Sequence, residues 1–587
     1  MFAGNSLRTI IPRMKLMARS GVVVVSLFVA AAAVAAWAHR PQPTAPPDLI
    51  LVNGHIVTVD DARPEAQAVA IRGDRIVAVG TTDEIKRSAG PNTKTIDLGG
   101  QLAIPGFIES HGHFTGVGEM KLELDLTKAQ TWDEIVAMVA EAAKTKKPGE
   151  WIRGRGWHQE KWAARPEPNV EGFPTHASLD HVSPANPVYL THASGHASFV
   201  NAKAMEASGI TRDTKNPAGG EILRDSTGDP TGLLRETASS LVRGPRLTGP
   251  EAAAHLRKVL ELAARESLSK GITTFEDAGS PLATIDGMKQ MVDEGQMGVR
   301  LWVMVRQPNE AIAPKLAQYK MIDRANGYLT VRAIKKQIDG ALGSRGAWLL
   351  EPYADKPDSV GINTTPIAEI RDTAGLAIEN GFQLCVHAIG DRANRETLNI
   401  FERAFAGHPD KTDLRWRVEH AQHLSAEDIP RFGKLGVIAS MQGIHCTSDA
   451  PYVLARLGPK RAEEGAYVWQ KLMKSGAVIA NGTDAPVEDV DPIPNFYASV
   501  SRKLKNGTVF YGDQRMSRME ALKSYTINGA YAAFEETNRG SLTPGKYADV
   551  TVVSKDIMTI PEDQIPSAKV VYTIVGGKIR YGGGPTF

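Results

Sequence analysis

The chain has 587 residues, of which 42% are hydrophobic and 23% are charged, and its formal net charge at pH 7 is +2. This composition is typical of a globular protein with a large core, and a charge so close to zero gives no support to a nucleic-acid partner. The only two cysteines, Cys385 and Cys446, exclude a disulfide framework and leave open one disulfide between them.

The first 38 residues have the pattern of a secretory signal peptide. Basic residues up to Arg19 precede an apolar run over 21–38, which ends in the small-x-small pattern Ala36-Trp37-Ala38. We expect cleavage after Ala38, a proline-rich linker over 39–47, and a periplasmic or secreted protein. The run is also close to the roughly 17–25 residues of a spanning helix, so an uncleaved anchor over 21–38 is the alternative, and only then would the protein contact a membrane.

Short strands are predicted at both ends of the mature chain. Residues 48–104 hold runs of β-branched residues separated by turn residues such as Asn53-Gly54, and residues 545–587 have the same character. Two such segments most simply pair into one sheet-rich domain, with the rest of the chain inserted between them. The predicted strands are 49–52, 55–59, 68–71, 75–79, 548–553 and 570–575.

The middle of the chain, residues 105–544, alternates strands with helical segments, which is typical of βα units around a parallel sheet. Including the stretch 106–114 it offers eight strands, the number of a (β/α)8 barrel. Residues from about 121 to 248 do not alternate, and we expect them to form a long insertion that helps to build a pocket. The other seven predicted strands are 271–277, 300–306, 331–338, 382–387, 416–420, 437–442 and 477–482.

Residue types that bind metals stand at the ends of four of these strands. His111 and His113 lie two apart at the first, and residues with this spacing on a strand point to the same face. His387, His420 and Asp484 end the fifth, sixth and eighth strands. In a parallel barrel these carboxyl ends meet at the active site. A lone histidine there is more often a hydrogen-bonded core residue, but a shared metal would satisfy all five buried polar groups at once.

Several short motifs accompany these strand ends, and together they resemble the amidohydrolase superfamily. The closer resemblance is to its amidohydrolase-3 branch, which includes YtcJ-like and N-substituted formamide deformylase-like proteins, and it covers nearly all of the mature chain. The motifs are Val52-Asn53-Gly54, Pro105-Gly106-Phe107-Ile108-Glu109-Ser110-His111-Gly112-His113, Gly154-Arg155-Gly156-Trp157, Ser194-Gly195-His196, Pro230-Thr231-Gly232, Asp339-Gly340-Ala341-Leu342-Gly343-Ser344-Arg345, His387-Ala388-Ile389-Gly390-Asp391, Glu419-His420-Ala421 and Gly482-Thr483-Asp484-Ala485-Pro486.

The resemblance implies a distorted (β/α)8 barrel with a composite β-sandwich made from both chain ends. It implies that His111, His113 and Asp484 bind one divalent metal ion, and that His387 and His420 bind a second. The bridging ligand in many relatives is a carboxylated lysine at the end of the fourth strand, and its spacing to Asp339-Gly340 selects Lys335 over Lys336. If Lys335 faces outward, a one-metal site remains, with His420 as a second-sphere or substrate ligand.

The mechanism follows from these ligands. A divalent metal lowers the pKa of bound water from about 15.7 to roughly 7, so that hydroxide is available to attack a carbonyl carbon. Imidazole and carboxylate ligands favour zinc without excluding manganese or iron. Asp484 is suited to take the proton from the water and pass it to the leaving nitrogen, and so to act as the catalytic residue. The predicted reaction is hydrolysis of a non-peptide C–N bond in a small amide or formamide.

Motif position indicates residues that contact the substrate. We expect Trp157, His196 and Arg345 to do so, and weigh packing or capping equally for His158, His192, Arg235, Asp391 and Gln442. Two other functions stay open: deamination of a heterocyclic amine, and non-catalytic binding on the same fold. The sequence contains neither Gly-x-Ser-x-Gly nor His-Glu-x-x-His, which disfavours a serine hydrolase and a zincin protease. A homo-oligomer and a monomer are both compatible with the sequence.

Overall fold

The computed structural model describes residues 45–245 and 247–582. The predicted signal peptide or anchor lies outside these ranges, as does most of the predicted linker. No helix within the described ranges is both long and apolar enough to cross a membrane. Cys385 and Cys446 are both buried and free, so the disulfide that the sequence left open is not formed.

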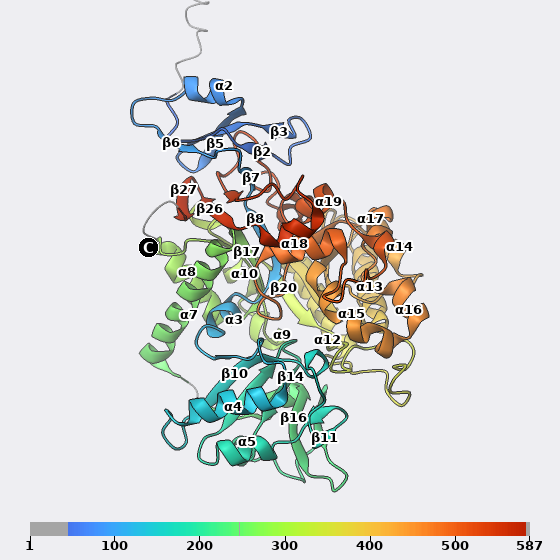
Figure 1. Ribbon diagram of the computed structural model, residues 1–587. Helices are drawn as coiled ribbons and strands as arrows, with labels where there is room; N and C mark the ends of the chain where they lie inside the picture. The colour runs from blue at the N-terminus through green and yellow to red at the C-terminus, as the bar shows by residue number, and fades with distance from the viewer. Residues whose placement is uncertain (1–44, 246, 583–587) are drawn as a thin grey trace, which may run out of the picture. The chain divides into compact units, whose positions relative to one another are not determined.

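Eight parallel strands form a barrel between the β-sheets at one end of the molecule and the inserted segment at the other (Figure 1). They lie side by side in chain order, as predicted. The first and last strands meet through two backbone hydrogen bonds, from Asp484 to His111 at 2.8 Å and from His113 to Ala485 at 2.6 Å, so the barrel is nearly closed. The strands are β8 (Phe107–Gly112), β17 (Ile272–Ser280), β18 (Arg300–Val305), β20 (Leu329–Gln337), β21 (Gln383–Ala388), β22 (Arg417–His420), β23 (Ile438–Met441) and β24 (Ile479–Asn481).

Helices cover the outside of the barrel, so its strands are buried on both faces. This explains their continuous apolar runs, such as Leu301–Val305, where every residue is buried. The short strand β19 (Met321–Asp323) pairs with β20. The helices are α7 (Gly249–Ser269), α8 (Leu282–Asp293), α9 (Asn309–Ile312), α10 (Leu316–Tyr319), α11 (Arg324–Gly327), α12 (Ile367–Asn380), α13 (Asp391–Gly407), α14 (Ile429–Leu435), α15 (Gly443–Leu457), α16 (Pro459–Gly465), α17 (Trp469–Lys474), α18 (Pro492–Ser501), α19 (Arg518–Ser524) and α20 (Ile527–Ala532).

The two ends of the chain build one β-sandwich, which confirms the prediction from their strand patterns. One sheet has the order β5-β4-β1-β6, and the other has the order β27-β26-β25-β7-β2-β3 and joins both chain ends. Apolar side chains from both sheets, including Leu51, Ile71, Val552 and Ile574, form a shared core. The elements are β1 (Leu49–Val52), β2 (His55–Val57), β3 (Glu65–Ala66), β4 (Ala68–Arg72), β5 (Arg75–Gly80), α2 (Thr82–Arg87), β6 (Lys94–Asp97), β7 (Leu102–Pro105), β25 (Val550–Val553), β26 (Val570–Val575) and β27 (Lys578–Tyr581).

The segment after β8 folds around its own six-stranded sheet, with the order β15-β16-β14-β13-β10-β9. Trp132, Trp157, Phe173 and Phe199 pack together in its core, which accounts for the many aromatic residues in this segment. The exact residue boundaries of the domains stay a prediction. The elements are α3 (Phe114–Glu119), β9 (Leu124–Asp125), α4 (Trp132–Ala143), β10 (Ile152–Trp157), β11 (Asn169–Val170), β12 (Phe173–Pro174), α5 (Ala177–Val182), β13 (Val188–His192), β14 (Ala197–Val200), α6 (Ala202–Ser208), β15 (Gly220–Arg224) and β16 (Pro230–Glu236).

Candidate metal centre

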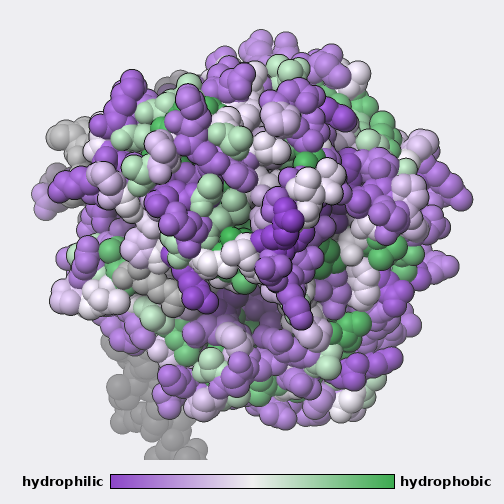
Figure 2. Space-filling view, turned by 90° about the horizontal axis from the view of Figure 1, so that it is seen from below, coloured by the Kyte–Doolittle hydropathy of each residue, from purple (hydrophilic) through white to green (hydrophobic). Residues whose placement is uncertain are grey.

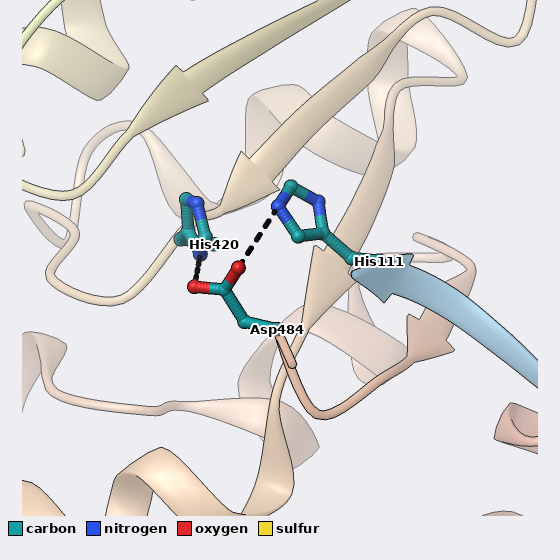
Figure 3. A group of neighbouring side chains, drawn as sticks. All are labelled: His111, His420 and Asp484. Carbon is teal, nitrogen blue, oxygen red and sulfur yellow. Dashed lines mark ion pairs between the residues drawn. The ribbon is translucent and has the colours of Figure 1, made fainter. Parts of the chain in front are cut away.

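Three buried side chains converge at the carboxyl ends of β8, β22 and β24 (Figure 3). One potential ligand atom from each of His111, His420 and Asp484 lies within 4.8 Å of the other two. The Nε2 atom of His111 is 3.6 Å from Oδ1 of Asp484, and Nδ1 of His420 is 4.0 Å from its Oδ2. His113 approaches the same carboxylate, with Nε2 3.3 Å from Oδ1. The structure therefore brings together four of the six predicted ligands around Asp484.

The backbone at this centre is held in unusual conformations. His420 has a φ of 78° and Asp484 a φ of 57°, in the left-handed region that most residues with side chains avoid. Gly112 separates His111 from His113, and a Cβ atom there would lie 2.6 Å from the ring of Phe275. The glycine is thus needed for close packing between β8 and β17. Strained backbone of this kind concentrates at functional sites.

Lys335 and His387, the other two predicted ligands, border the same centre. The Nζ atom of Lys335 is 3.4 Å from Nε2 of His111, so this lysine faces inward. The neighbouring Lys336 forms an ion pair with Glu369 at 2.8 Å. The ring centroid of His387 lies 4.5 Å from that of His420. The predicted ligands thus form one continuous group.

A buried ionic network supports His111 from behind. Its Nδ1 atom contacts Oε2 of Glu419, and Nε of Arg417 lies 2.8 Å from Oε1 of the same carboxylate. Arg417 also donates to Glu276 at 2.5 Å, and all four side chains are fully buried. A metal-binding histidine commonly donates its second ring nitrogen to a carboxylate, which fixes the ring and its tautomer. This network was not predicted from the sequence, although Arg417 and Glu419 lie two residues apart on β22 and therefore point to the same face of the strand.

Asp339 supports the neighbouring side of the site. It accepts backbone hydrogen bonds from Ile389 at 3.0 Å, Gly390 at 2.8 Å and Trp348 at 2.9 Å. Its Oδ1 atom is 3.5 Å from Nε2 of His387. Burial raises the pKa of Asp339 to about 7. This residue therefore fixes the loop that carries His387, and it too was named in a sequence motif without a role.

The electrostatics of the centre favour the protonation states that bind a metal. Burial lowers the pKa of His387 and His420 well below the ordinary value, which keeps both imidazoles neutral. Burial alone would raise the pKa of Asp484, but His113, His420 and His111 hold it well below the usual range, so the carboxylate is ionised. Neutral imidazole and carboxylate are the ligand forms that zinc and similar ions require.

The donor set fits a divalent ion. Among the described residues, Oδ1 of Asp484 and Nε2 of His387 are buried without a hydrogen-bond partner. Leaving such atoms unsatisfied costs free energy, and a metal ligated by them removes that cost. His111, His420 and Asp484 would hold one ion, with His113 beside the same carboxylate, so His420 is grouped here with the first predicted set of ligands. The second ion, at His387 and His420, stays a prediction.

Replacing Lys335 by Met is expected to stabilise the metal-free protein at pH 7. Burial lowers the pKa of Lys335 from 10.5 to about 8, so the unfolded chain holds this proton more tightly than the folded protein does. From 1.36 kcal/mol per pKa unit, the cost is on the order of 3 kcal/mol. It is fully present below pH 8 and disappears as the pH rises from 8 towards 10.5. Urea unfolding of the chelator-treated wild-type protein and variant at pH 7 and pH 10 measures this difference in stability. An equal stabilisation by Lys335→Met at both pH values would contradict the lowered pKa of Lys335.

A cavity of about 610 Å³ opens onto the centre. His113, Lys335, His387, His420 and Asp484 line it together with residues from the inserted segment. The face of the molecule seen in Figure 2 is hollowed, and hydrophilic residues surround much of the hollow. Cavities of this size hold small organic ligands.

Of the three residues predicted to contact the substrate, one lines this cavity. His196 comes from the inserted segment, and its Nδ1 atom is 2.8 Å from Oε2 of Glu236. Burial opposes protonation of His196, but the charge of Glu236 outweighs it and raises the pKa. The ring of His196 lies 4.9 Å from that of His387, so its second nitrogen is available near the centre.

The structure places Trp157 and Arg345 elsewhere, which corrects those two predictions. Trp157 is fully buried in the core of the inserted segment, where its Nε1 donates to the carbonyl of Leu190 at 3.0 Å. Arg345 forms an ion pair with Asp355 at 3.0 Å. Both side chains stabilise the fold, and neither lines the cavity.

The five residues for which substrate contact and a packing or capping role have equal weight also fall into two groups, those that stabilise the fold and those that line a pocket. Gln442 holds His420, with Oε1 2.8 Å from Nδ1, while Asp391 accepts a backbone hydrogen bond from Leu350 at 2.8 Å. Arg235 forms ion pairs with Glu171 and Glu221. The remaining two, His158 and His192, line a small side pocket that also reaches Asp484.

Known proteins resemble this chain over most of its length. A family model described as "Amidohydrolase family" matches residues 94–581, and one described as "Imidazolonepropionase-like composite domain, bacteria" matches residues 68–89. The chain is 33% identical to Protein LONG AFTER FAR-RED 3 of Arabidopsis thaliana, over 91% of each chain. It is 31% identical to Putative amidohydrolase YtcJ of Bacillus subtilis, over 90% of this chain and 98% of that protein. Identity to N-substituted formamide deformylase of Arthrobacter pascens is 27%, over 91% and 98%.

Two solved structures share the fold closely. An uncharacterized metal-dependent hydrolase from Pyrococcus horikoshii OT3 has a TM-score of 0.69 and 24% identity, covering 88% of this chain and 99% of its own. An uncharacterized metal-dependent hydrolase from Pyrococcus furiosus has a TM-score of 0.66 and 26% identity, covering 87% and 100%. The described part of the chain thus shares its overall fold with these two solved structures.

Proposed function

Because the chain belongs to the amidohydrolase family, we propose that it is a metal-dependent hydrolase that cleaves a non-peptide C–N bond in a small amide or formamide. The observation that carries this proposal is the convergence of His111, His420 and Asp484 at the open end of the barrel, beside a cavity that can admit a substrate. The name of the formamide deformylase relative supports the bond type.

Asp484 and His196 have different roles in the proposed reaction. The chemistry that a divalent ion supplies when bound is a water of lowered pKa, from about 15.7 to roughly 7, and polarisation of a carbonyl. Asp484 is ionised and lies at the centre, so its second carboxylate oxygen, Oδ2, can accept a proton and deliver it to the leaving nitrogen. His196, held by Glu236 and lining the cavity, is placed to donate to the substrate carbonyl oxygen.

Lys335 decides how many ions the site holds. Burial lowers its pKa to about 8, so the neutral form of this amine, the only form that reacts with carbon dioxide, is more populated near pH 7 than in an ordinary lysine, although it is still the minor form. A carboxylated Lys335 would add an anionic ligand between the His111 and His387 sides of the site. Zinc is the proposed ion because imidazole and carboxylate are among its usual ligands.

Metal analysis combined with a hydrolysis screen tests the proposed function. We expect at least one divalent ion per chain after purification without chelator, and turnover of members of an amide and formamide panel, with release of amine and carboxylate. Chelation should abolish turnover, and added zinc should restore it. Less than one ion per chain would contradict the proposal, and release of ammonia without formation of a carboxylate would indicate a deaminase instead.

A further inference from the structure

The cavity beside the metal centre contains two arginines that the proposed reaction does not use. Arg155 stands on β10 of the inserted segment, and Arg306 follows β18 of the barrel. Both side chains line the cavity that opens onto Asp484. They therefore approach the substrate space from two different parts of the chain.

Neither guanidinium has a carboxylate partner among the described residues. Arg155 contacts the carbonyl oxygens of Ala193 at 3.3 Å and Pro486 at 3.5 Å. Arg306 donates to the side-chain oxygen of Gln337 at 2.8 Å. A guanidinium has five N–H donors, so each arginine keeps donors that these contacts do not use.

The other charged groups in the cavity are already engaged. Lys336 is paired with Glu369 at 2.8 Å, and Glu236 is paired with His196 at 2.8 Å. Lys335 belongs to the metal centre. The two arginines thus leave the substrate space with an excess of positive charge, which a metal at the centre would increase.

Both arginines also act within electrostatic reach of the reacting centre. Burial lowers the pKa of Arg155, and the charge of Asp484 opposes that effect. Arg306 is exposed, and the negative charges of Asp277 and Asp484 both favour its charged form. The backbone makes room for Arg306, because a Cβ atom at Gly279 would lie 2.8 Å from Cβ of this arginine.

We propose that the substrate is an amide that carries a carboxylate away from the scissile bond, and that Arg155 and Arg306 supply the positive charge and the N–H donors that bind this carboxylate. Arginine–carboxylate hydrogen bonds are charge-assisted and often bidentate, so they orient a substrate as well as hold it. An N-formyl or N-acetyl amino acid is the simplest molecule of this class. The inference rests on the proposed amidohydrolase function and narrows its substrate.

Matched substrate pairs test the inference on the zinc-loaded enzyme. Each N-formyl or N-acetyl derivative of glycine, leucine and phenylalanine is compared with its neutral C-terminal amide, by kcat/KM for release of the acyl group. We expect the carboxylates to be preferred by about 10- to 100-fold, the range that charge-assisted hydrogen bonds supply. Arg155→Gln and Arg306→Gln should each reduce this preference, mainly by slowing the carboxylate substrates.

The matched control is Arg324→Gln, which removes a guanidinium from an exposed ion pair with Asp293 and should leave the preference unchanged. Binding gives a second readout, since calorimetry of N-acetylphenylalanine with the Asp484→Asn variant needs no turnover. The Kd should weaken by about 10-fold or more when Arg155 or Arg306 is also replaced, and should rise with salt concentration.

Four outcomes separate the possibilities. Equal rates on carboxylates and neutral amides, unchanged in both arginine variants, would overturn the inference and leave the proposed function intact. A variant that slows both members of each pair equally would assign its arginine a structural role and overturn it too. Faster hydrolysis of N-acetyl-aminoethylphosphonate than of N-acetyl-β-alanine would overturn the assignment to a carboxylate. Absence of turnover on every amide, despite full zinc loading, would instead be a failure of the proposed function.

Discussion

Asp484→Asn is expected to reduce turnover at least about 1,000-fold while the protein stays folded. General acid–base catalysis contributes typically 10²–10⁴-fold, and Asp484 is also a predicted metal ligand, so one substitution removes both roles. The carboxylate lies 3.3 Å from His113 and 3.6 Å from His111, and no other described carboxylate belongs to this group of three potential ligands. Steady-state kinetics on any amide that the wild-type protein hydrolyses measure the effect.

Asparagine is the suitable replacement because the backbone here is unusual. Asp484 has a φ of 57°, and asparagine is among the residues that tolerate this region best. The fold should therefore persist, with a circular dichroism spectrum like that of the wild-type protein. The control is Asp372→Asn, an exposed position on α12. A variant at Asp484 that keeps more than a tenth of the wild-type kcat would remove this residue from proton transfer.

The barrel could be predicted because each of its strands has a recognisable local sequence pattern. A strand buried on both faces needs a continuous apolar run, and each of the eight runs could be read without knowing its neighbours. The carboxyl ends of parallel strands then meet by topology alone. For this reason His111, His387, His420 and Asp484, far apart in the sequence, could be placed together beforehand.

Contacts that depend on side-chain packing could not be predicted in this way. Trp157 ends a motif that also contains Arg155, and strand alternation alone would put these two side chains on the same face. A register shift between them on β10, where Gly156 has a φ of 112°, breaks this alternation. The structure buries the tryptophan in the aromatic core of the inserted segment and leaves Arg155 at the cavity. Similarly, the glycine-rich loop before Arg345 indicates a flexible approach to a ligand, but the nearby Asp355 pairs with this arginine.

The ionic network that contacts His111 could not be predicted from the sequence for a different reason. Glu276, Arg417 and Glu419 come from strands β17 and β22, which are not neighbours in the sheet order. Their contacts cross the barrel interior, where strand pairing carries no information. Buried charges are expensive alone, so three on inward-facing positions indicate mutual pairing once the barrel is assumed. This pairing can therefore be inferred from the charged residues only after the barrel topology is known.

Glu419→Gln is expected to weaken metal binding by about 10- to 100-fold and to destabilise the fold by about 3 kcal/mol. The carboxylate contacts Nδ1 of His111, and loss of such a partner typically reduces metal affinity by this factor. The glutamine keeps the shape of the side chain but removes the charge that Arg417 faces at 2.8 Å. Breaking a buried ion pair from one side typically costs about 3–5 kcal/mol, because the remaining charge stays buried.

Because of Glu276, we expect the loss of stability in Glu419→Gln to lie at the lower end of that range. Burial raises its pKa to about 8, and the charge of Glu419 contributes to the shift. When that charge is removed, Glu276 ionises more readily and becomes a better partner for Arg417. Zinc titration and urea unfolding of the metal-free protein measure the two effects separately. Glu402→Gln, which removes a half-exposed partner of Arg431, is the control and should cost at most about 1 kcal/mol. Unchanged zinc affinity in Glu419→Gln would show that the orientation of His111 does not depend on this carboxylate.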